Sequence, residues 1–340
     1  MGKLWQNSLN RDEQLALSQK IAGATGMDER AIEKDWWVTI VLKALSQTRY
    51  AHLMSFKGGT SLSKGWNLIG RFSEDIDIAI KREDMFAISG TSNTQIAKAR
   101  RTSRHYIVRQ LPDELTDIIA RMGVVGFSIE PELTRERNGE PIELRADTHP
   151  SVIYLNYQSI FPHLSPYILP KVKIEFGCLS MDEPIEEKMI RSYYSAYDAD
   201  CDDMSVPFKT VVPTRTFLEK MFLLHEEFQK ERPRSLRMSR HLYDLERLMD
   251  TDYSKDALAD RELYETVVKH RETFNHLDGI DYALHSPETI DFIPPKHLIS
   301  DWKRDYNALS DSHIYDREKI SFEQLMIRMD ELLTRVRNMQ

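Results

Sequence analysis

The strand-forming segments of this chain are confined to its first part, and this uneven distribution limits the folds available to it. Strict alternation or short apolar runs predict strands over 75–80, 124–129, 152–157 and 171–176. After about residue 205, apolar residues recur at helical spacing, as in Phe217, Met221, Leu224 and Phe228. We therefore predict an α+β domain over residues 1–205, followed by a mainly helical domain over residues 206–340.

Further helices are predicted from apolar spacing and from turn signals. Their expected ranges are the first fifty residues, 95–121, 239–250, 259–275, 298–309 and 321–338. Ser321 and Gln324 have the spacing of a capping box, which places the start of the last helix. Residues 131–150 are rich in Glu, Arg, Asn, Gly and Pro, and this composition predicts a hairpin or a long loop.

The composition excludes several classes of protein. Acidic residues exceed basic ones by 54 − 46 = 8, so the whole chain is not a basic nucleic-acid coat protein. Cys178 and Cys201 cannot form a disulfide framework, and they lack metal-ligand spacing. No run approaches the ~18 apolar residues of a membrane span, and the N-terminus lacks the apolar core of a signal peptide. We expect a cytoplasmic protein with no membrane partner.

A Gly-Gly turn is the first candidate for a binding function. In Lys57-Gly58-Gly59-Thr60-Ser61, two glycines at the start of a helix let backbone N–H groups approach a phosphate closely. Thr60 and Ser61 add hydroxyl donors there. The alternative is a Gly-Gly pair that serves only as a turn.

Two acids on the best-defined strand give a sharper signal. Period-two alternation over residues 75–80 places Asp75 and Asp77 on one face, opposite a buried row of isoleucines. Adjacent carboxylates repel unless a cation lies between them, and Mg²⁺ prefers such oxygen ligands. The alternative is a pair of solvated acids on an edge strand.

A third acid is predicted on a neighbouring strand. In residues 171–176, Val172, Ile174 and Phe176 form the buried face, so Glu175 points the other way, beside Lys173. With Asp75 and Asp77 it would complete a two-metal carboxylate triad, in which one ion activates a hydroxyl and the other the leaving pyrophosphate. The alternative is a surface acid paired with Lys173.

These motifs resemble the nucleotidyltransferase superfamily of the DNA polymerase β type, and within it the AbiEii toxin family, which includes the MenT toxins. The resemblance rests on the segments 33–38, 57–64, 71–77, 217–220 and 239–245, and it covers about residues 30 to 250. The long gap between Gly59 and Asp75, and Thr-Ser where Gly-Ser is usual, are at home in the AbiEii branch. The resemblance implies a polymerase β-like domain with a mixed sheet, followed by a helical domain that completes the nucleotide site.

The resemblance also implies roles for individual residues. Lys220 would contact the triphosphate, with Arg240 and Asp244 beside the nucleotide. Lys57 and Lys64 flank the glycines as further candidates for phosphate contact. Arg240 and Asp244 are also spaced as an ordinary i,i+4 ion pair, and either of the two flanking lysines can be a solvated surface residue.

Other polar residues carry less information. His225 and His241 have no partner at metal-ligand spacing, so we expect both to be structural or solvated. Two basic clusters can hold RNA phosphates or form solvated helix faces. The first contains Lys98, Arg100, Arg101, Arg104 and Arg109, and the second contains Lys230, Arg232, Arg234, Arg237 and Arg240.

Together these features predict a Mg²⁺-dependent enzyme that transfers an NMP from an NTP to an acceptor hydroxyl. The resemblance implies that the acceptor is the tRNA 3′ end, that the protein is a toxin neutralised by a cognate antitoxin, and that it is linked to phage defence. One alternative is the same chemistry on a protein or a small molecule. Another is a non-catalytic module that binds a nucleotide or an antitoxin.

Overall fold

The computed structural model describes residues 3–137, 139–162, 168–181, 184–202 and 204–339. The chain divides into two compact units. The first contains Met1–Gly65 and Ser73–Thr210, and the second contains Trp66–Phe72 and Val211–Gln340. The chain therefore enters the second unit for seven residues, returns, and enters it again after Thr210. The expected boundary at residue 205 coincides with the first residue of a strand, Ser205–Val211.

A mixed seven-stranded sheet forms the centre of the first unit. Its order is β3-β6-β7-β2-β1-β9-β8. The strands are β1 (Met54–Lys57), β2 (Ile76–Ile80), β3 (Phe127–Pro131), β6 (Ser151–Tyr157), β7 (Lys171–Gly177), β8 (Ile185–Arg191) and β9 (Ser205–Val211). β2 is parallel to β7 and antiparallel to β1. All four predicted strands are present, whereas β1, β8 and β9 were not predicted.

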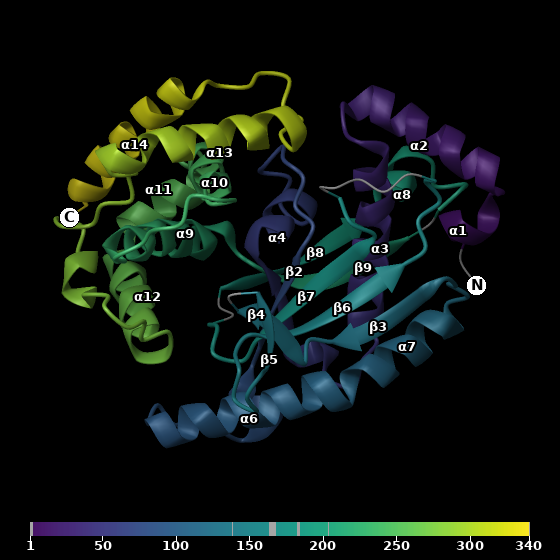
Figure 1. Cartoon of the computed structure of the whole chain (residues 1–340), viewed down its shortest axis with the longest axis horizontal. Helices are drawn as coiled ribbons and strands as arrows, with labels where there is room; N and C mark the ends of the chain where they lie inside the picture. Colours follow the sequence, from purple (N-terminus) through teal and green to yellow (C-terminus); the bar gives the residue numbers. More distant parts are fainter. Residues whose placement is uncertain (1–2, 138, 163–167, 182–183, 203, 340) are drawn as a thin grey trace. The chain divides into compact units, whose positions relative to one another are not determined.

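Helices cover this sheet and bury its apolar residues. They are α1 (Trp5–Ser8), α2 (Arg11–Thr25), α3 (Glu29–Leu45), α4 (Gly58–Lys64), α5 (Arg82–Phe86), α6 (Asn93–Arg109), α7 (Leu111–Arg121) and α8 (Tyr193–Tyr197), with a short 3₁₀ turn, η1 (Ala51–Leu53). α3 packs on β7, α6 on β6 and α7 on β3, as can be followed in Figure 1. The single helix expected over 95–121 is two helices, because Gln110 leaves the helical conformation just before Pro112.

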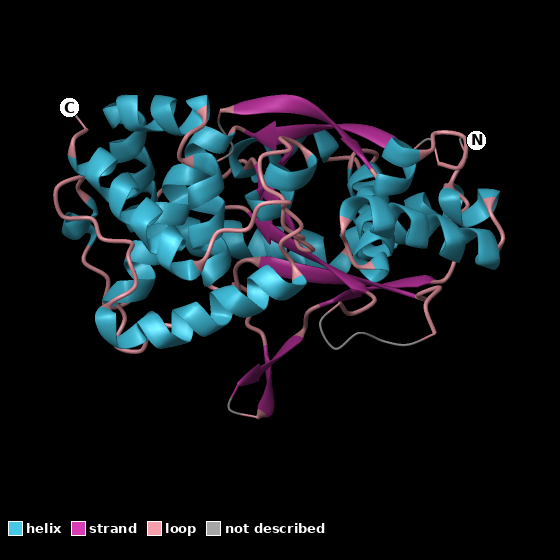
Figure 2. Cartoon of the chain, turned by 90° about the horizontal axis from the view of Figure 1, so that it is seen from above, coloured by secondary structure: helices cyan, strands magenta, loops and turns pink. Residues whose placement is uncertain are grey.

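The region 131–150 forms the predicted hairpin. Its strands, β4 (Thr134–Arg137) and β5 (Glu140–Glu143), pair with each other and with no other described strand. Every residue of both strands is exposed to solvent. Figure 2 shows this hairpin projecting away from the seven-stranded sheet.

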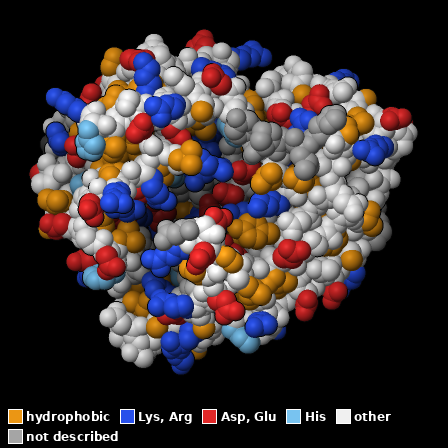
Figure 3. Space-filling view, in the orientation of Figure 1, with side chains coloured by type: hydrophobic (Ala, Val, Ile, Leu, Met, Phe, Trp, Pro, Cys, Tyr) orange, Lys and Arg blue, Asp and Glu red, His pale blue; other side chains and the backbone are white. Residues whose placement is uncertain are grey.

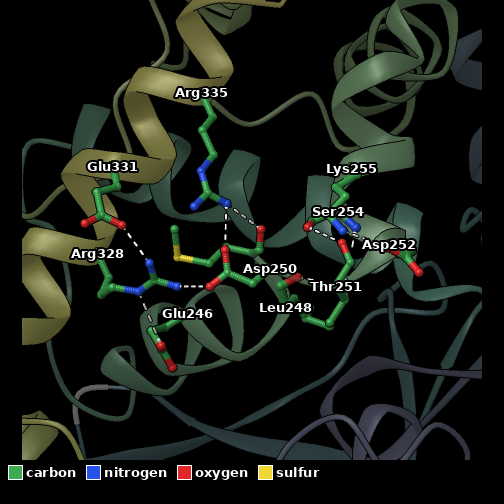
Figure 4. Close-up of polar contacts among 11 residues, drawn as sticks. Glu246, Leu248, Asp250, Thr251, Asp252, Ser254, Lys255, Arg328, Glu331 and Arg335 are labelled. Atoms are coloured by element: carbon green, nitrogen blue, oxygen red, sulfur yellow. Dashed lines mark hydrogen bonds and ion pairs between the residues drawn. The ribbon is translucent and has the colours of Figure 1, made fainter.

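The second unit is helical, as predicted. It contains α9 (Pro213–Gln229), α10 (Ser239–Leu248), α11 (Asp252–Ala259), α12 (Arg261–Phe274), η2 (Tyr282–His285), η3 (Lys296–Leu298), α13 (Ile299–Ser312) and α14 (Phe322–Arg337). The capping box of Ser321 and Gln324 is confirmed. Arg328 and Arg335 bind Asp250 and so fasten α14 to the end of α10 (Figure 4). In the described part of the chain, no helix is long and apolar enough to cross a membrane.

Candidate active site

The turn between β1 and α4 places a glycine against an acid. Lys57 is opposite Asp77 in the antiparallel pairing of β1 and β2. Gly58 has a φ of +78°, and a Cβ on it would lie 2.1 Å from Oδ2 of Asp77. Any other residue here would strain the backbone and displace the carboxylate. The first glycine of the Gly-Gly pair is therefore needed for the close approach of Asp77.

The predicted strand faces are confirmed. Ile76, Ile78 and Ile80 are buried, whereas Asp77 is half-buried. Asp75 is also half-buried and lies one residue before β2 begins. On β7, Val172, Ile174 and Phe176 are completely buried and Glu175 is not. Both strands thus present their acids on the face opposite their apolar residues.

The sheet brings two of the predicted acids side by side. β2 and β7 are parallel neighbours, and Asp77 is paired with Glu175 in their register. Because both strands continue the same sheet, paired residues project from the same face. The expectation that Glu175 lies on the strand next to Asp77 is therefore confirmed, and its convergence with Asp75 stays a prediction.

Lys173 neutralises part of this acidic group. Its ammonium binds the Glu175 carboxylate directly. Burial lowers the pKa of Lys173, but the hydrogen bond to Glu175 and the charges of Glu175 and Asp75 outweigh burial and raise it. The sequence offered two alternatives for Glu175, an ion pair with Lys173 or a position beside Asp77. The structure shows both at once.

The donor chemistry of these residues suits Mg²⁺, but the side chains are not yet arranged around an ion. Carboxylate oxygens are the ligands that Mg²⁺ prefers. Within the described ranges, no three acidic, histidine or cysteine side chains converge as a metal site. Glu175 is held by Lys173 and would have to exchange that ammonium for the ion. Asp75, Asp77 and Glu175 therefore fit Mg²⁺ by residue type and backbone position, and their role as its ligands stays a prediction.

The hydroxyls next to the glycines are used within the chain. Thr60 donates to the carbonyl oxygen of Asp75 at 2.5 Å and contacts the Ser73 hydroxyl at 2.8 Å. Ser61 donates to the carbonyl oxygen of Gly58 at 2.9 Å. Both side chains are buried. These bonds fix the segment that leads into Asp75, while phosphate binding by the two hydroxyls stays a prediction.

Three consecutive polar residues of α3 are buried, and each binds a partner outside the helix. Glu33 accepts hydrogen bonds from the Ser159 hydroxyl and the Ile160 N–H, and burial raises its pKa to about 7. Lys34 binds Glu74 at 2.6 Å, immediately before Asp75.

The third of these residues, Asp35, binds Lys64 at the end of α4. The distance between Nζ and Oδ1 is 2.5 Å, and both side chains are buried. Lys64 also donates to the carbonyl oxygen of Arg191. As placed, Lys64 braces α4, and contact with a phosphate would require this pair to open. Lys57, the other flanking lysine, lies beside Asp77 at the end of β1.

The second unit contains a buried charged trio that includes two of the predicted residues. Asp244 is completely buried. Its Oδ2 accepts from Lys220 Nζ at 2.7 Å, and its two oxygens accept from Nε and Nη2 of Arg71, also at 2.7 Å. Burial alone would raise the pKa of Asp244, but Arg71 and Lys220 hold it well below its usual range. Asp244 therefore positions the two cations.

Arg71 is the residue of this trio to which the sequence analysis gave no role. It belongs to the short excursion 66–72, and it forms a β-bridge with Ile314. One signal in the sequence could have indicated such a residue. Asp244 lies on the inward side of α10, and a buried carboxylate needs a cation, which can come from outside its own helix. Arg240 lies in the electrostatic surroundings of Lys220, but the hydrogen bonds described for Asp244 come from Arg71 and Lys220.

The two histidines have structural surroundings. His225 is buried and contacts the backbone of Asp291 and the side chain of Gln229. Burial, followed by the charges of Lys220 and Arg240, lowers the pKa of His241 far below its usual range. His241 is therefore neutral at physiological pH, and the expectation that neither histidine binds a metal stays a prediction.

Comparison with known proteins identifies the class. Residues 40–328 match the profile of a family described as "Nucleotidyl transferase AbiEii toxin, Type IV TA system". The chain belongs to this AbiEii family of nucleotidyltransferase toxins, which confirms the resemblance found in the sequence. Membership implies an NTP substrate and a cognate antitoxin. No curated protein matches the chain.

A solved structure confirms the fold class. MenT4, a nucleotidyltransferase toxin from Mycobacterium tuberculosis H37Rv, is similar with a TM-score of 0.57 and 18% identity, over 98% of this chain and 91% of MenT4. JHP933 from Helicobacter pylori matches with a TM-score of 0.41 and 16% identity, over 92% of this chain and 93% of its own. At these identities the likeness concerns the fold alone, and the inference about the fold rests on the MenT4 match.

Proposed function

We propose that this protein is a cytoplasmic, Mg²⁺-dependent toxin that transfers an NMP from an NTP to the 3′ end of tRNA. Its activity would be countered by the antitoxin and would serve phage defence. The observation that carries the proposal is the pairing of Asp77 with Glu175 on adjacent parallel strands, with Gly58 against Asp77 and Asp75 one residue before β2. A module that only bound a nucleotide would not need acids placed together in this way.

In the proposed reaction, the acceptor hydroxyl oxygen forms a bond to the α-phosphorus of the NTP. The bond from that phosphorus to the bridging oxygen of the β-phosphate breaks, and pyrophosphate leaves. The hydroxyl proton passes to a carboxylate, for which Glu175 is the candidate once it has separated from Lys173. Mg²⁺ held by Asp75, Asp77 and Glu175 would supply charge neutralisation and a more acidic hydroxyl.

Charged and backbone groups of the chain have supporting roles in this proposal. The N–H groups around Gly58 and Gly59, with Lys57, would bind phosphate oxygens. Lys220, held by Asp244, is proposed to contact the triphosphate as a point charge, with Arg240 beside the nucleotide. The fixed position of Lys220 supports this role, because a preorganised cation stabilises developing charge without first having to reorganise.

A single labelling experiment tests the proposal and its alternatives. The protein is incubated with each of the four α-³²P-labelled NTPs, Mg²⁺, and either total RNA or lysate protein. Label in RNA of tRNA size that is lost on treatment with a 3′ exonuclease supports the proposal. Label in protein supports the same chemistry on another acceptor, and absence of label from both supports a non-catalytic module. Asp77→Asn serves as the control for contaminating transferases.

A further inference from the structure

A groove in the first unit lies outside the carboxylate site. It has a volume of about 600 Å³ and lies between α6 and the base of the β4–β5 hairpin. One wall is basic and is formed by Arg101, Arg104, His105 and Arg109, and the other is apolar and includes Leu133 and Leu144. No acidic side chain is among the described residues that line it. Figure 3 shows Lys and Arg side chains gathered over this part of the first unit.

The basic wall is a row. Arg101, His105 and Arg109 are four residues apart on α6, so they recur about every 6 Å along one side of the helix. All three are exposed, and among the described residues Arg101 and Arg109 have no ion-pair partner. Arginines spaced along one side of a helix follow a polyanionic strand better than they enclose a single compact anion.

Arg104 gives the groove a fixed cation at its inner edge. The residue is 5% exposed, and its Nη2 donates to the carbonyl oxygen of Glu132 at 2.9 Å. Its Nη1 is buried and has no hydrogen-bond partner in the part of the chain described. Burial lowers the pKa of this guanidinium. A buried guanidinium with an unused donor is costly unless an anion completes its coordination.

Charged groups connect the groove to the carboxylates. Burial, followed by the positive charges of Arg100 and Lys57, lowers the pKa of His149 to about 3. The charges of Arg100 on α6 and of Lys57 at the end of β1 therefore both act on His149. On the hairpin side, Arg135 binds Glu132 and lies within the field of Glu175. The hydrogen bonds make the same connection: Glu132, whose carbonyl oxygen accepts from Arg104, donates its N–H to the carbonyl oxygen of Val152 on β6. Val152 is paired with Glu175 on β7, so the inner edge of the groove lies one strand away from that carboxylate.

The second basic cluster contrasts with this row. Lys230 and Arg234 both bind Glu227, at 2.6 and 2.8 Å, and that carboxylate is 1% exposed. Lys230 and Arg234 thus share one buried carboxylate as a counterion. On α6, by contrast, Arg101 and Arg109 are exposed and form no ion pair with a described residue.

We propose that the groove between α6 and the hairpin binds the backbone of a single-stranded RNA segment of the acceptor. The arginines of the basic wall would contact phosphates, the apolar wall would accommodate base or ribose faces, and the strand would lead toward Asp75 and Asp77. This proposal rests on the proposed function, because it places the acceptor of that reaction. An acidic protein segment is the competing occupant, but it would not need to lead toward a carboxylate site.

The test measures RNA binding without catalysis. The probe is a fluorescein-labelled 20-nucleotide single-stranded RNA ending in CCA, and its anisotropy is measured between 50 and 200 mM salt without NTP or Mg²⁺. The groove variant is Arg101→Gln with Arg109→Gln, two exposed positions whose change should leave the fold intact by circular dichroism. The matched control, Arg232→Gln with Arg237→Gln, removes the same charge from the second cluster.

We expect the groove variant to bind about tenfold more weakly and to lower the slope of log affinity against log salt by about 1.4, since each lost contact with a single strand removes about 0.7. The control should match the wild type. An unchanged slope in the groove variant overturns the proposal, and so does a larger effect in the control. Weaker binding of a poly-glutamate probe with unchanged RNA binding also overturns it, in favour of an acidic protein.

The outcomes separate this proposal from the proposed function. If the groove variant lowers the salt slope but the wild type labels no RNA, the groove binds RNA and the proposed transfer is wrong. If the wild type labels tRNA and the groove variant retains its KM and slope, the proposed transfer is right and the groove proposal is wrong.

Discussion

Substitutions in the buried trio of Arg71, Lys220 and Asp244 can distinguish a residue that stabilises the fold from one that contacts the substrate. Asp244 is completely buried and compensates two cations whose side chains are 4% and 8% exposed. Asp244→Asn keeps the shape but removes the carboxylate charge that binds Arg71 and Lys220. Removing one partner of a buried ion pair costs about 3–5 kcal/mol. At about 2–4 °C per kcal/mol, we expect Tm to fall by about 10 °C.

Lys220→Met should behave differently. The variant keeps the apolar stem of the side chain and leaves Asp244 bound to Arg71 through two hydrogen bonds, so one negative charge faces one positive charge. We expect a loss of about 1–2 kcal/mol, which is typical of a lost hydrogen bond to a charged group. If Lys220 contacts the triphosphate, transfer should slow by ~10²-fold or more.

The assay compares urea unfolding and Tm with the rate of ³²P-NMP transfer for both variants. Lys255→Met is the matched control, because Lys255 forms an ion pair with Asp252 in which the side chains are 68% and 90% exposed. It should change neither quantity measurably. The reasoning is refuted if Asp244→Asn melts within 2–3 °C of the wild type (about 1 kcal/mol). Equal destabilisation by Lys220→Met would make Lys220 a structural residue.

Four further predictions concern the first unit. Gly58→Ala should abolish transfer by displacing Asp77, whereas Gly26→Ala, also at positive φ but with open space around it, should cost only stability; normal transfer by Gly58→Ala would exclude the predicted clash. Asp75→Asn should abolish transfer while Tm in the absence of metal stays the same or rises, because like-charge repulsion is relieved; an active variant would remove Asp75 from the metal site. Lys173→Met should tighten binding of Mn²⁺, measured by electron paramagnetic resonance, by up to about fivefold, the worth of a partly exposed ion pair; weaker binding would count against competition for Glu175. The pKa of Glu33 is raised to about 7 from 4.5 in the unfolded chain. Its protonated form therefore stabilises the fold below pH 4.5, and this contribution, at most about 3 kcal/mol, is lost as the pH rises to about 7. Glu33→Gln should lack this loss when urea midpoints at pH 5 and pH 8 are compared, and a pH dependence identical to that of the wild type would show that Glu33 ionises normally.

The strands that carry the acids could be predicted because their pattern is local. Alternation over residues 75–80 and 171–176 fixes which side chains are buried, and the structure follows it at every position of β2 and β7 except Ala79 and Gly177, which have no polar side chain to expose. β8 (Ile185–Arg191) was missed because it lies at the edge of the sheet and carries charges. β9 was missed because Pro207 argues against a strand, although its alternate positions are buried.

The contacts of the site depend on pairings over long sequence distances, which local patterns do not specify. The alignment of Asp77 with Glu175 requires a parallel register between strands about a hundred residues apart. The approach of Arg71 to Asp244 spans 173 positions. By contrast, the pair of Lys173 and Glu175 is separated by two residues on one strand, and it was posed correctly as an alternative.

The excursion of residues 66–72 into the second unit has a consequence for synthesis on the ribosome. Arg71 emerges 244 − 71 = 173 residues before Asp244, which corresponds to about 10–35 s at 5–20 residues per second. By Val211, the last residue of β9, the described strands of the sheet have all been synthesised, whereas Asp244, which binds Arg71, has not. The second unit can therefore be completed only by capturing a loop of a unit that has already had time to fold. A chain divided at residue 205 would yield a C-terminal fragment in which Asp244 meets Lys220 but never Arg71.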